Sequence, residues 1–367
     1  MEKKTVLIIF GGYSTEYYVS CKSAGGILEY IDKDKFNVIK VGVTIDGKWI
    51  YTEAEPEEIA DGITWIKNKE NKSALISPKR NENNLIVLDN KGSMKIHIDC
   101  VFPVIHGHGG EDGSIQGLLE ICNISYVGSN VAASANSMDK YLTRTFAENC
   151  NLKQPKCIVL RINEYNENEI EKRIDFDYPI YVKPASLGSS VGITKVDMPS
   201  ELNDAIKVAF RYEDKILIEE GIVGSEIKVA ILGNENLKVG AVCELKVPED
   251  SINDYATKYI KCSSTKKIPA DISQELESKV KEQACLIYKE LNCSGFARVD
   301  FFLSKDNEVY FNEINTVPGI SKTSIFTMMF EEVGISYKEI ITNLIELSFQ
   351  KNGQVSEINN DSFKSII

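Results

Sequence analysis

Two short apolar segments near the C-terminus restrict the fold of this chain more than any other part of the sequence. The segments GFARVDFF (295–302) and VYFNEIN (309–315) are rich in Val, Phe and Tyr, and the polar residues 304–308 lie between them. Apolar runs joined by a short polar stretch are typical of a β-hairpin. A two-residue turn at Asp306 and Asn307 would fix how the two strands pair.

This pairing would place four polar side chains on one face of the hairpin. Asp300 would face Glu313 and Arg298 would face Asn315, and the alternation of side chains along a strand puts all four on the same side. Two opposed carboxylates repel each other unless a cation lies between them. Asp, Glu and Asn form an oxygen-only ligand set that suits Mg²⁺ or Mn²⁺ and not zinc. The hairpin therefore predicts a metal and phosphate site; a solvated hairpin with ordinary surface charges is the alternative.

The composition excludes several classes of protein. A chain of 367 residues is long enough for two or three domains. Its net charge of −12 argues against nucleic-acid or anionic-membrane partners. The nine cysteines form no CxxC pair and are typical of reduced cytosolic thiols. The N-terminal apolar run is too short for a signal peptide and no segment is long enough to span a membrane, so we expect a cytoplasmic protein.

The N-terminal part alternates between strands and helices. Segment 5–10 is predicted as a strand, 19–31 as a helix and 37–44 as a second strand, an order that predicts a parallel sheet. Residues 47–95 are polar and irregular. Within them, the segment 67–93 is rich in Glu, Lys and Asn, and we expect it to form a surface insertion with short strands that could contact a partner.

Two glycine-rich loops follow predicted strands of this sheet. The first contains Gly11 and Gly12, and the second is HGHGGEDGS, between a strand at 100–105 and a helix at 115–122. Because ligands of open α/β sheets bind at the carboxyl ends of strands, both loops are candidate binding loops. Strands and helices continue to a final helix near 337–349.

A third loop, PASLGSS, is expected to contact phosphate. It follows Lys183 and does not match the Walker pattern, but its backbone N–H groups and the hydroxyls of Ser189 and Ser190 could close over phosphate oxygens. Lys140 and Lys183 could neutralise phosphate charge. A surface turn and two lysines with solvated ends are the alternative interpretation.

Eight segments together resemble the D-alanine–D-alanine ligases of the ATP-grasp superfamily, including their D-Ala–D-Ser branch. They occur in the family's order, and the match extends over roughly residues 5–350. The segments are GGYSTEYYVS (11–20), VIHGHGGEDGSIQG (104–117), SMDKYLTR (137–144), YVKPASLGSSVGITKV (181–196), LIEEGIVGSE (217–226), DYATKY (254–259), GFARVDFF (295–302) and FNEINTVPG (311–319).

The resemblance implies a mixed α/β and α+β fold of three domains. These would be an N-terminal domain with a doubly wound parallel sheet (1–133), a central ATP-grasp lid domain (134–216) and a C-terminal ATP-grasp domain (217–350), followed by a flexible tail (351–367). It also implies a homodimer.

The family's roles can be carried over by position. The resemblance implies that Glu16 holds the donor ammonium together with Ser189 and Tyr259, and that His106 lines the donor pocket. It further implies an oxyanion-stabilising role for Arg298. The implied ATP-binding residues are Lys140, Lys183, Ser190, Glu219, Glu226 and Lys258. The implied ligands of two Mg²⁺ or Mn²⁺ ions are Asp300, Glu313 and Asn315.

The implied reaction is ATP-dependent joining of D-alanine to a second D-amino acid through a D-alanyl phosphate, for peptidoglycan precursors. Two departures from the family pattern affect this expectation. Leu187 stands where an acid is usual and would change how the lid closes. Residues 322–325, which resemble the acceptor subsite and include Ser324 and Ile325, leave the choice between D-alanine and D-serine open.

Two other functions remain possible from the sequence. One is a different ATP-grasp carboxylate–amine ligase, although Glu16 in the first glycine loop favours the D-alanine enzymes. The other is a nucleotide-binding regulatory protein without turnover, which would have no need of Arg298.

Overall fold

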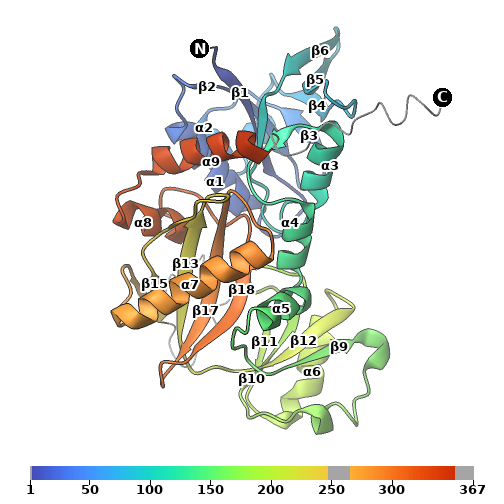
Figure 1. Cartoon of the computed structure of the whole chain (residues 1–367). Helices are drawn as coiled ribbons and strands as arrows, with labels where there is room; N and C mark the ends of the chain where they lie inside the picture. The colour runs from blue at the N-terminus through green and yellow to red at the C-terminus, as the bar shows by residue number, and fades with distance from the viewer. Residues whose placement is uncertain (1, 247–264, 352–367) are drawn as a thin grey trace, which may run out of the picture.

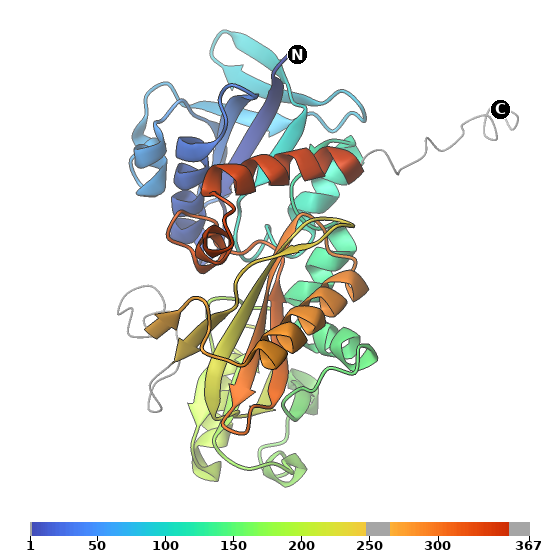
Figure 2. The same ribbon diagram turned by 60° about the vertical axis from the view of Figure 1, so that its left-hand side comes forward.

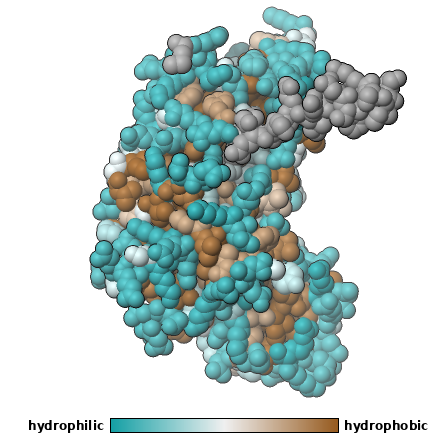
Figure 3. Space-filling view, in the orientation of Figure 1, coloured by the Kyte–Doolittle hydropathy of each residue, from teal (hydrophilic) through white to brown (hydrophobic). Residues whose placement is uncertain are grey.

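The computed structural model describes residues 2–246 and 265–351, which form three β-sheets with flanking helices. Figure 1 shows the three sheets one below another, with the sheet that begins the chain at the top and the four-stranded sheet at the bottom. The surface in this view is mostly hydrophilic, with apolar side chains gathered in smaller patches (Figure 3). None of the described helices is both long and apolar enough to cross a membrane.

The first sheet has eight strands in the order β6-β5-β4-β3-β2-β1-β7-β8. Its parallel half is β2-β1-β7-β8, as the alternating segments predict. The short strands expected within 67–93 are present, but they are not a separate insertion, because four strands from 47–97 continue the same sheet in antiparallel pairs. The strands are β1 (Lys4–Gly11), β2 (Phe36–Val43), β3 (Trp49–Tyr51), β4 (Lys72–Ile76), β5 (Asn84–Asp89), β6 (Gly92–His97), β7 (Cys100–Pro103) and β8 (Ser125–Tyr126).

Helices cover both faces of the parallel half. Alternate residues of β1 point to opposite sides, so Val6 and Ile8 belong to one buried cluster and Leu7 to another. The first cluster contains apolar residues of α1 (Tyr17–Tyr30) and α9 (Tyr337–Lys351), and the second those of α3 (Ser114–Cys122). Figures 1 and 2 show α9, the last helix, lying across the sheet that begins the chain. The short helix α2 (Pro56–Ala60) packs on α1.

The second sheet is four-stranded and antiparallel, in the order β11-β10-β12-β9. It follows two helices in succession, because Asp139 ends the first and its carboxylate caps the second. The elements are α4 (Val131–Met138), α5 (Lys140–Asn149), β9 (Cys157–Arg161), β10 (Ile180–Pro184), β11 (Thr194–Val196), α6 (Leu202–Ala209) and β12 (Lys215–Glu220). Single 3₁₀ turns are η1 (Trp65–Lys67), η2 (Ile162–Glu164), η3 (Glu171–Arg173) and η4 (Pro199–Glu201).

The third sheet carries the predicted hairpin and packs on one long helix, α7 (Gln274–Glu290). Its strand order is β16-β15-β13-β17-β18, and β14 pairs with β13. The strands are β13 (Gly224–Leu232), β14 (Lys238–Val239), β15 (Cys243–Lys246), β16 (Thr265–Lys267), β17 (Phe296–Ser304) and β18 (Val309–Asn315); α8 (Ile325–Glu332) follows. The predicted domain limits remain a prediction.

The predicted pairing of the hairpin is confirmed at the site, although the predicted turn is wrong. Asp300 faces Glu313 and Arg298 faces Asn315, as expected. Near the tip, however, the pairs are shifted by one residue, because Ser304 closes a three-residue turn with Glu308. A β-bulge between Asp300 and Phe301 shifts the pairing back. The shift at the turn and the opposite shift at the bulge cancel, so Asp300 and Arg298 have the partners that the sequence predicts.

Candidate active site

A cavity of about 800 Å³ lies where the three sheets meet. Its wall comes from the two glycine-rich loops of the first sheet, the loop that follows β10, the helix start at Lys140, and the hairpin with the segment after it. The predicted site residues in its lining are Glu16, His106, Lys140, Ser189, Arg298, Glu313, Asn315, Ser324 and Ile325. Residues predicted from distant parts of the chain are therefore brought together.

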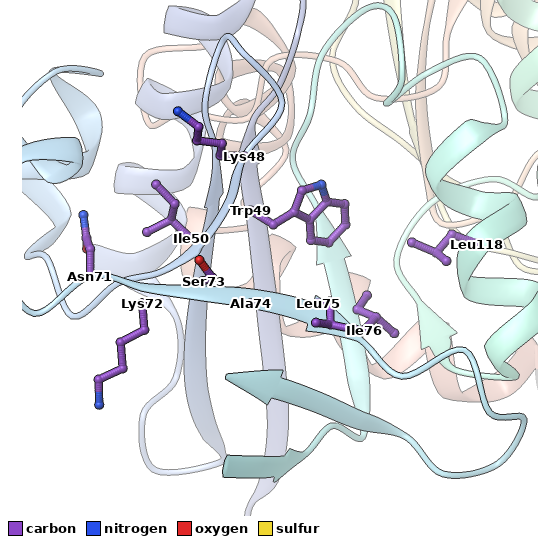
Figure 4. Close-up of a pocket in the computed structure, with 10 residues that line it drawn as sticks. All are labelled: Lys48, Trp49, Ile50, Asn71, Lys72, Ser73, Ala74, Leu75, Ile76 and Leu118. Carbon is purple, nitrogen blue, oxygen red and sulfur yellow. The ribbon is translucent and has the colours of Figure 1, made fainter. Parts of the chain in front are cut away.

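Another hollow, of about 650 Å³, lies on the first sheet beside β3 and β4 (Figure 4). Trp49, Leu75 and Leu118 are among its lining residues, and no predicted site residue is. The 800 Å³ cavity is therefore the candidate active site.

Glu16 connects the first sheet to the loop that follows β10. The Ser189 hydroxyl donates a hydrogen bond to its carboxylate. Glycines stand on either side: a Cβ placed on Gly107 would lie 2.6 Å from Glu16 Oε2, and one on Gly188 would lie 3.0 Å from it. Because no larger residue fits at these distances, the loop can close directly onto the carboxylate.

His106 is almost fully buried and is held at both ring nitrogens. Nδ1 lies 2.9 Å from the Val317 carbonyl oxygen, to which it donates, and Nε2 lies 3.1 Å from the Ser23 hydroxyl. Burial lowers the pKa of His106, but the neighbouring Glu111 and Glu16 carboxylates together hold the pKa above its ordinary value. The imidazole is therefore a fixed part of the cavity wall.

Asp300 lies at the centre of an ion-pair network on the third sheet. Arg298 donates two hydrogen bonds to its carboxylate, from Nε at 2.6 Å and from Nη2 at 2.7 Å. Lys228 Nζ donates a third at 2.7 Å. Glu313, opposite, lies 3.6 Å from Lys140 Nζ. The premise that only a metal ion could neutralise the two carboxylates is therefore wrong, because the chain supplies cations itself.

The oxygen ligand set nevertheless fits a divalent cation. Asp300, Glu313 and Asn315 are neighbours in the hairpin, and the Asn315 amide has its Nδ2 atom buried without a hydrogen-bond partner among the described residues. Turning the amide would place its oxygen there, since amide oxygen and nitrogen are exchanged by a half-turn. Within 2–246 and 265–351, no three His, Cys, Asp or Glu side chains form a metal cluster, so the hairpin offers two carboxylates and one amide to a hard cation.

Lys183 and Glu219 form a separate buried ion pair on neighbouring strands of the second sheet. Arg144 Nη1 lies 3.2 Å from the other oxygen of Glu219. Neither Lys183 nor Glu219 is in the cavity lining. The third predicted acid, Glu226, lies 2.9 Å from Lys228 Nζ and so joins the Asp300 network. Lys258 and Tyr259 lie outside the described residues.

The loop that follows β10 is held by a lysine and an acid. Lys140 Nζ donates to the Leu187 carbonyl at 2.8 Å, and its backbone N–H donates to the Ala185 carbonyl at 2.9 Å. The Glu213 carboxylate accepts the backbone N–H of Ser186 at 2.8 Å. Leu187 therefore helps to hold this loop through its backbone carbonyl, and this contact does not need the acidic side chain that is usual in the family.

The segment expected to contact the acceptor is only partly at the cavity. Ser324 lies in the lining, and its hydroxyl accepts the backbone N–H of Ser321 at 2.9 Å. Lys322 is exposed and extends elsewhere: its ammonium lies 4.9 Å from the Tyr30 ring centre and 3.8 Å from Glu331. Lys322, which departs from the family pattern, is therefore not part of the cavity wall.

Sequence reasoning missed three charged residues of this region: Lys228, Arg144 and Glu111. A signal existed for Lys228, because it follows Glu226 by two positions in a predicted strand and must share its face. No comparable signal marks Arg144, whose partner Glu219 is distant in sequence. Glu111 lies in the second glycine loop, where its carboxylate accepts the Gly107 N–H at 3.0 Å.

Comparison with known proteins agrees with this geometry. Residues 5–129 match the family model for the D-ala D-ala ligase N-terminus, and residues 146–346 match that for the C-terminus. A D-alanine–D-alanine ligase of Acetivibrio thermocellus is 43% identical over 95% of this chain and 97% of its own length. One from Natranaerobius thermophilus is 39% identical over the whole of both chains.

Two solved structures share the fold over almost the full length. The VanG D-Ala:D-Ser ligase of Enterococcus faecalis is 37% identical, with a TM-score of 0.85 over 95% of this chain and 100% of its own. The D-alanine–D-alanine ligase of Coxiella burnetii is 30% identical, with a TM-score of 0.85 over 100% of this chain and 97% of its own. With both family models and near-complete relatives in agreement, the chain belongs to the D-alanine–D-alanine ligase family, whose members are ATP-dependent ligases with the ATP-grasp architecture.

Proposed function

We propose that this protein is an ATP-dependent D-alanine–D-alanine ligase that supplies a dipeptide for peptidoglycan precursors. One observation carries the proposal: a single cavity contains Glu16, latched by Ser189, on one side and the Arg298, Glu313 and Asn315 cluster on the other. The Glu16 carboxylate, beside the loop that carries Ser189, is suited to binding the ammonium group of an amino acid. The opposite wall suits phosphate and its metal ions.

In the first step, a carboxylate oxygen of the donor D-alanine attacks the γ-phosphorus of ATP, and the bond to the β–γ bridging oxygen breaks to release ADP. Glu16 holds the donor ammonium, and Lys140 and Lys183 neutralise the phosphate oxygens. Mg²⁺ or Mn²⁺, as two ions bound through Asp300, Glu313 and Asn315, would withdraw charge from the transferred phosphoryl group. Glu219 and Glu226 accept hydrogen bonds from the nucleotide's base and ribose, and Ser190 and Lys258 contact its phosphates.

In the second step, the acceptor amine, after losing a proton, attacks the acyl carbon of the D-alanyl phosphate. The carbon–oxygen bond to phosphate then breaks and inorganic phosphate leaves. Arg298 would stabilise the oxyanion, a contribution of about 3 kcal/mol for a donor of this kind. The Ser189 latch and Tyr259 hold the donor and exclude water, which would otherwise hydrolyse the acyl phosphate.

A D-Ala–D-Ser ligase is the second candidate, and two observations favour it. A D-Ala:D-Ser ligase is among the structures of the same fold. The cavity wall also carries Thr323 and Ser324, whose hydroxyls offer polar contacts near the expected acceptor position, together with the apolar Ile325.

The acceptor profile tests both candidates. Purified protein with ATP, Mg²⁺ and D-alanine should form ADP and a product with the mass of D-alanyl-D-alanine. Adding D-serine or D-lactate in competition, with product masses, then ranks the acceptors. If no acceptor gives D-alanine-dependent ADP formation, the ligase proposal is wrong. We further propose a cytoplasmic location, since all eight described cysteines are free thiols and ATP is a cytoplasmic substrate. We also propose a homodimer, which the resemblance to the family implies.

A further inference from the structure

Lys228 is a buried cation placed between two functional acids. Its Nζ lies 2.7 Å from Asp300 Oδ2 and 2.9 Å from Glu226 Oε2. The side chain is only 6% exposed, and Asp300 faces Lys228 directly across the β13–β17 pair. Lys228 is also in the lining of the active-site cavity. None of the roles proposed above uses it.

The charges around Lys228 balance without any bound ion. Glu226, Asp300 and Glu313 contribute three negative charges, and Lys228, Arg298 and Lys140 contribute three positive charges. Lys228 Nζ is within ion-pair distance of both Glu226 and Asp300, so these two carboxylates share one ammonium. These three acidic and three basic side chains together carry no net charge.

A divalent cation must compete with this arrangement. All three hydrogen bonds that the structure gives to Asp300 come from cations, and Lys228 and Arg298 Nη2 both use Oδ2. An incoming cation would compete with them for the Asp300 carboxylate and would be repelled by both positive charges at close range.

We propose that Lys228 is an internal counter-cation that neutralises Asp300 and Glu226 in the metal-free protein and weakens divalent-cation binding at the hairpin. The ammonium occupies the position where a metal would otherwise be the main positive charge, and it also joins Asp300 to Glu226. This inference rests on the proposed function for the existence of the metal site. It assigns Lys228 a positioning role, not a catalytic one.

The test is direct Mn²⁺ binding without nucleotide, measured by loss of the free-ion EPR signal. K228M should bind Mn²⁺ at least about tenfold more tightly than the natural protein, because one opposing charge is removed. K228R, which keeps the charge, should stay within about threefold. K215M removes a lysine from another part-buried ion pair, with Asp139, and should not change Mn²⁺ affinity.

Unchanged or weaker Mn²⁺ binding by folded K228M would overturn the inference, as would the absence of Mn²⁺ binding in both the natural protein and K228M up to millimolar concentrations. If K228M does not fold, K228Q replaces it with the same expected result, since its amide is neutral but can still donate to Asp300. Tighter Mn²⁺ binding without D-alanine-dependent ADP formation would reject the proposed function alone. Normal turnover with unchanged Mn²⁺ affinity would reject this inference alone.

Discussion

The hydroxyl of Ser189 donates a hydrogen bond to the carboxylate of Glu16, although the two residues are 173 positions apart and belong to different sheets. The S189A variant lacks this hydrogen bond, which links the loop after β10 to the first sheet. A hydrogen bond to a charged group contributes about 1.5–3 kcal/mol, so we expect kcat/KM for D-alanine to fall by roughly 10- to 150-fold. S190A is the matched control, because both serines have a positive φ, 51° and 59°. It should raise the KM for ATP instead; equal effects of both variants on D-alanine would contradict the latch.

Asp300 should matter for folding as well as for activity. D300N leaves Arg298 and Lys228 without their shared carboxylate, and breaking a buried ion pair from one side costs about 3–5 kcal/mol. We therefore expect a large loss in the free energy of unfolding, measured by urea titration, together with loss of ligase activity. E308Q is a suitable control, since its pair with Lys153 is half exposed. A D300N protein as stable as the natural one would show that the network contributes little.

Gly42 in β2 packs directly against an aromatic ring, which leaves no room for a side chain. A Cβ at this position would lie 2.3 Å from the Cη2 atom of Trp65, which is fully buried. Because neither the strand nor the indole can move freely, G42A should destabilise the protein by about 1–3 kcal/mol. Thermal or urea unfolding would measure this. G117A is the control: its Cβ would meet nothing nearer than 4.0 Å and lies in helix α3, where alanine is favoured over glycine.

Asp112 should make stability depend on pH at the acidic end. Burial raises the pKa of its carboxyl, but backbone N–H groups of Gly109 and Ser114 donate to the carboxylate and together hold the pKa below the ordinary 3.8. The folded pKa is lower than the unfolded pKa, so the stabilisation is present above pH 3.8 and is lost as pH falls through the folded value. Urea unfolding from pH 6 to pH 2 should show a smaller loss for D112N than for the natural protein. Identical curves would rule out this contribution.

The sequence predicted the site better than its surroundings, for physical reasons. Strand period and apolar composition depend on local sequence, and so the pairing of Asp300 with Glu313 could be predicted. The bulge and the three-residue turn could not, because they depend on how the strands twist and pack. Short strands were expected within 67–93, but not that they would extend the first sheet, because strand order depends on contacts between distant segments. The edge strand β6 is mostly exposed and gives no apolar alternation.

The charge network shows a further limit of sequence reasoning. Opposed carboxylates in a hairpin suggested a metal ion, but the neutralising ammonium comes from Lys228 on the neighbouring strand. Which strand lies beside the hairpin is a property of sheet order, and no local pattern gives it. The ion pair between Arg144 and Glu219 was hidden in the same way, since one partner is on a helix and the other on a strand 75 positions later.

The position of α9 has a consequence for synthesis of the protein. Ile341 and Leu344 of this last helix belong to the same buried cluster as Val6 and Phe102 of the first sheet. One face of β1 and β7 is therefore made early during translation, but α9, which helps to cover it, is complete only when nearly the whole chain has left the ribosome. During that interval the nascent chain exposes an apolar surface that chaperones can bind, and a chain that stops before residue 337 would keep it exposed.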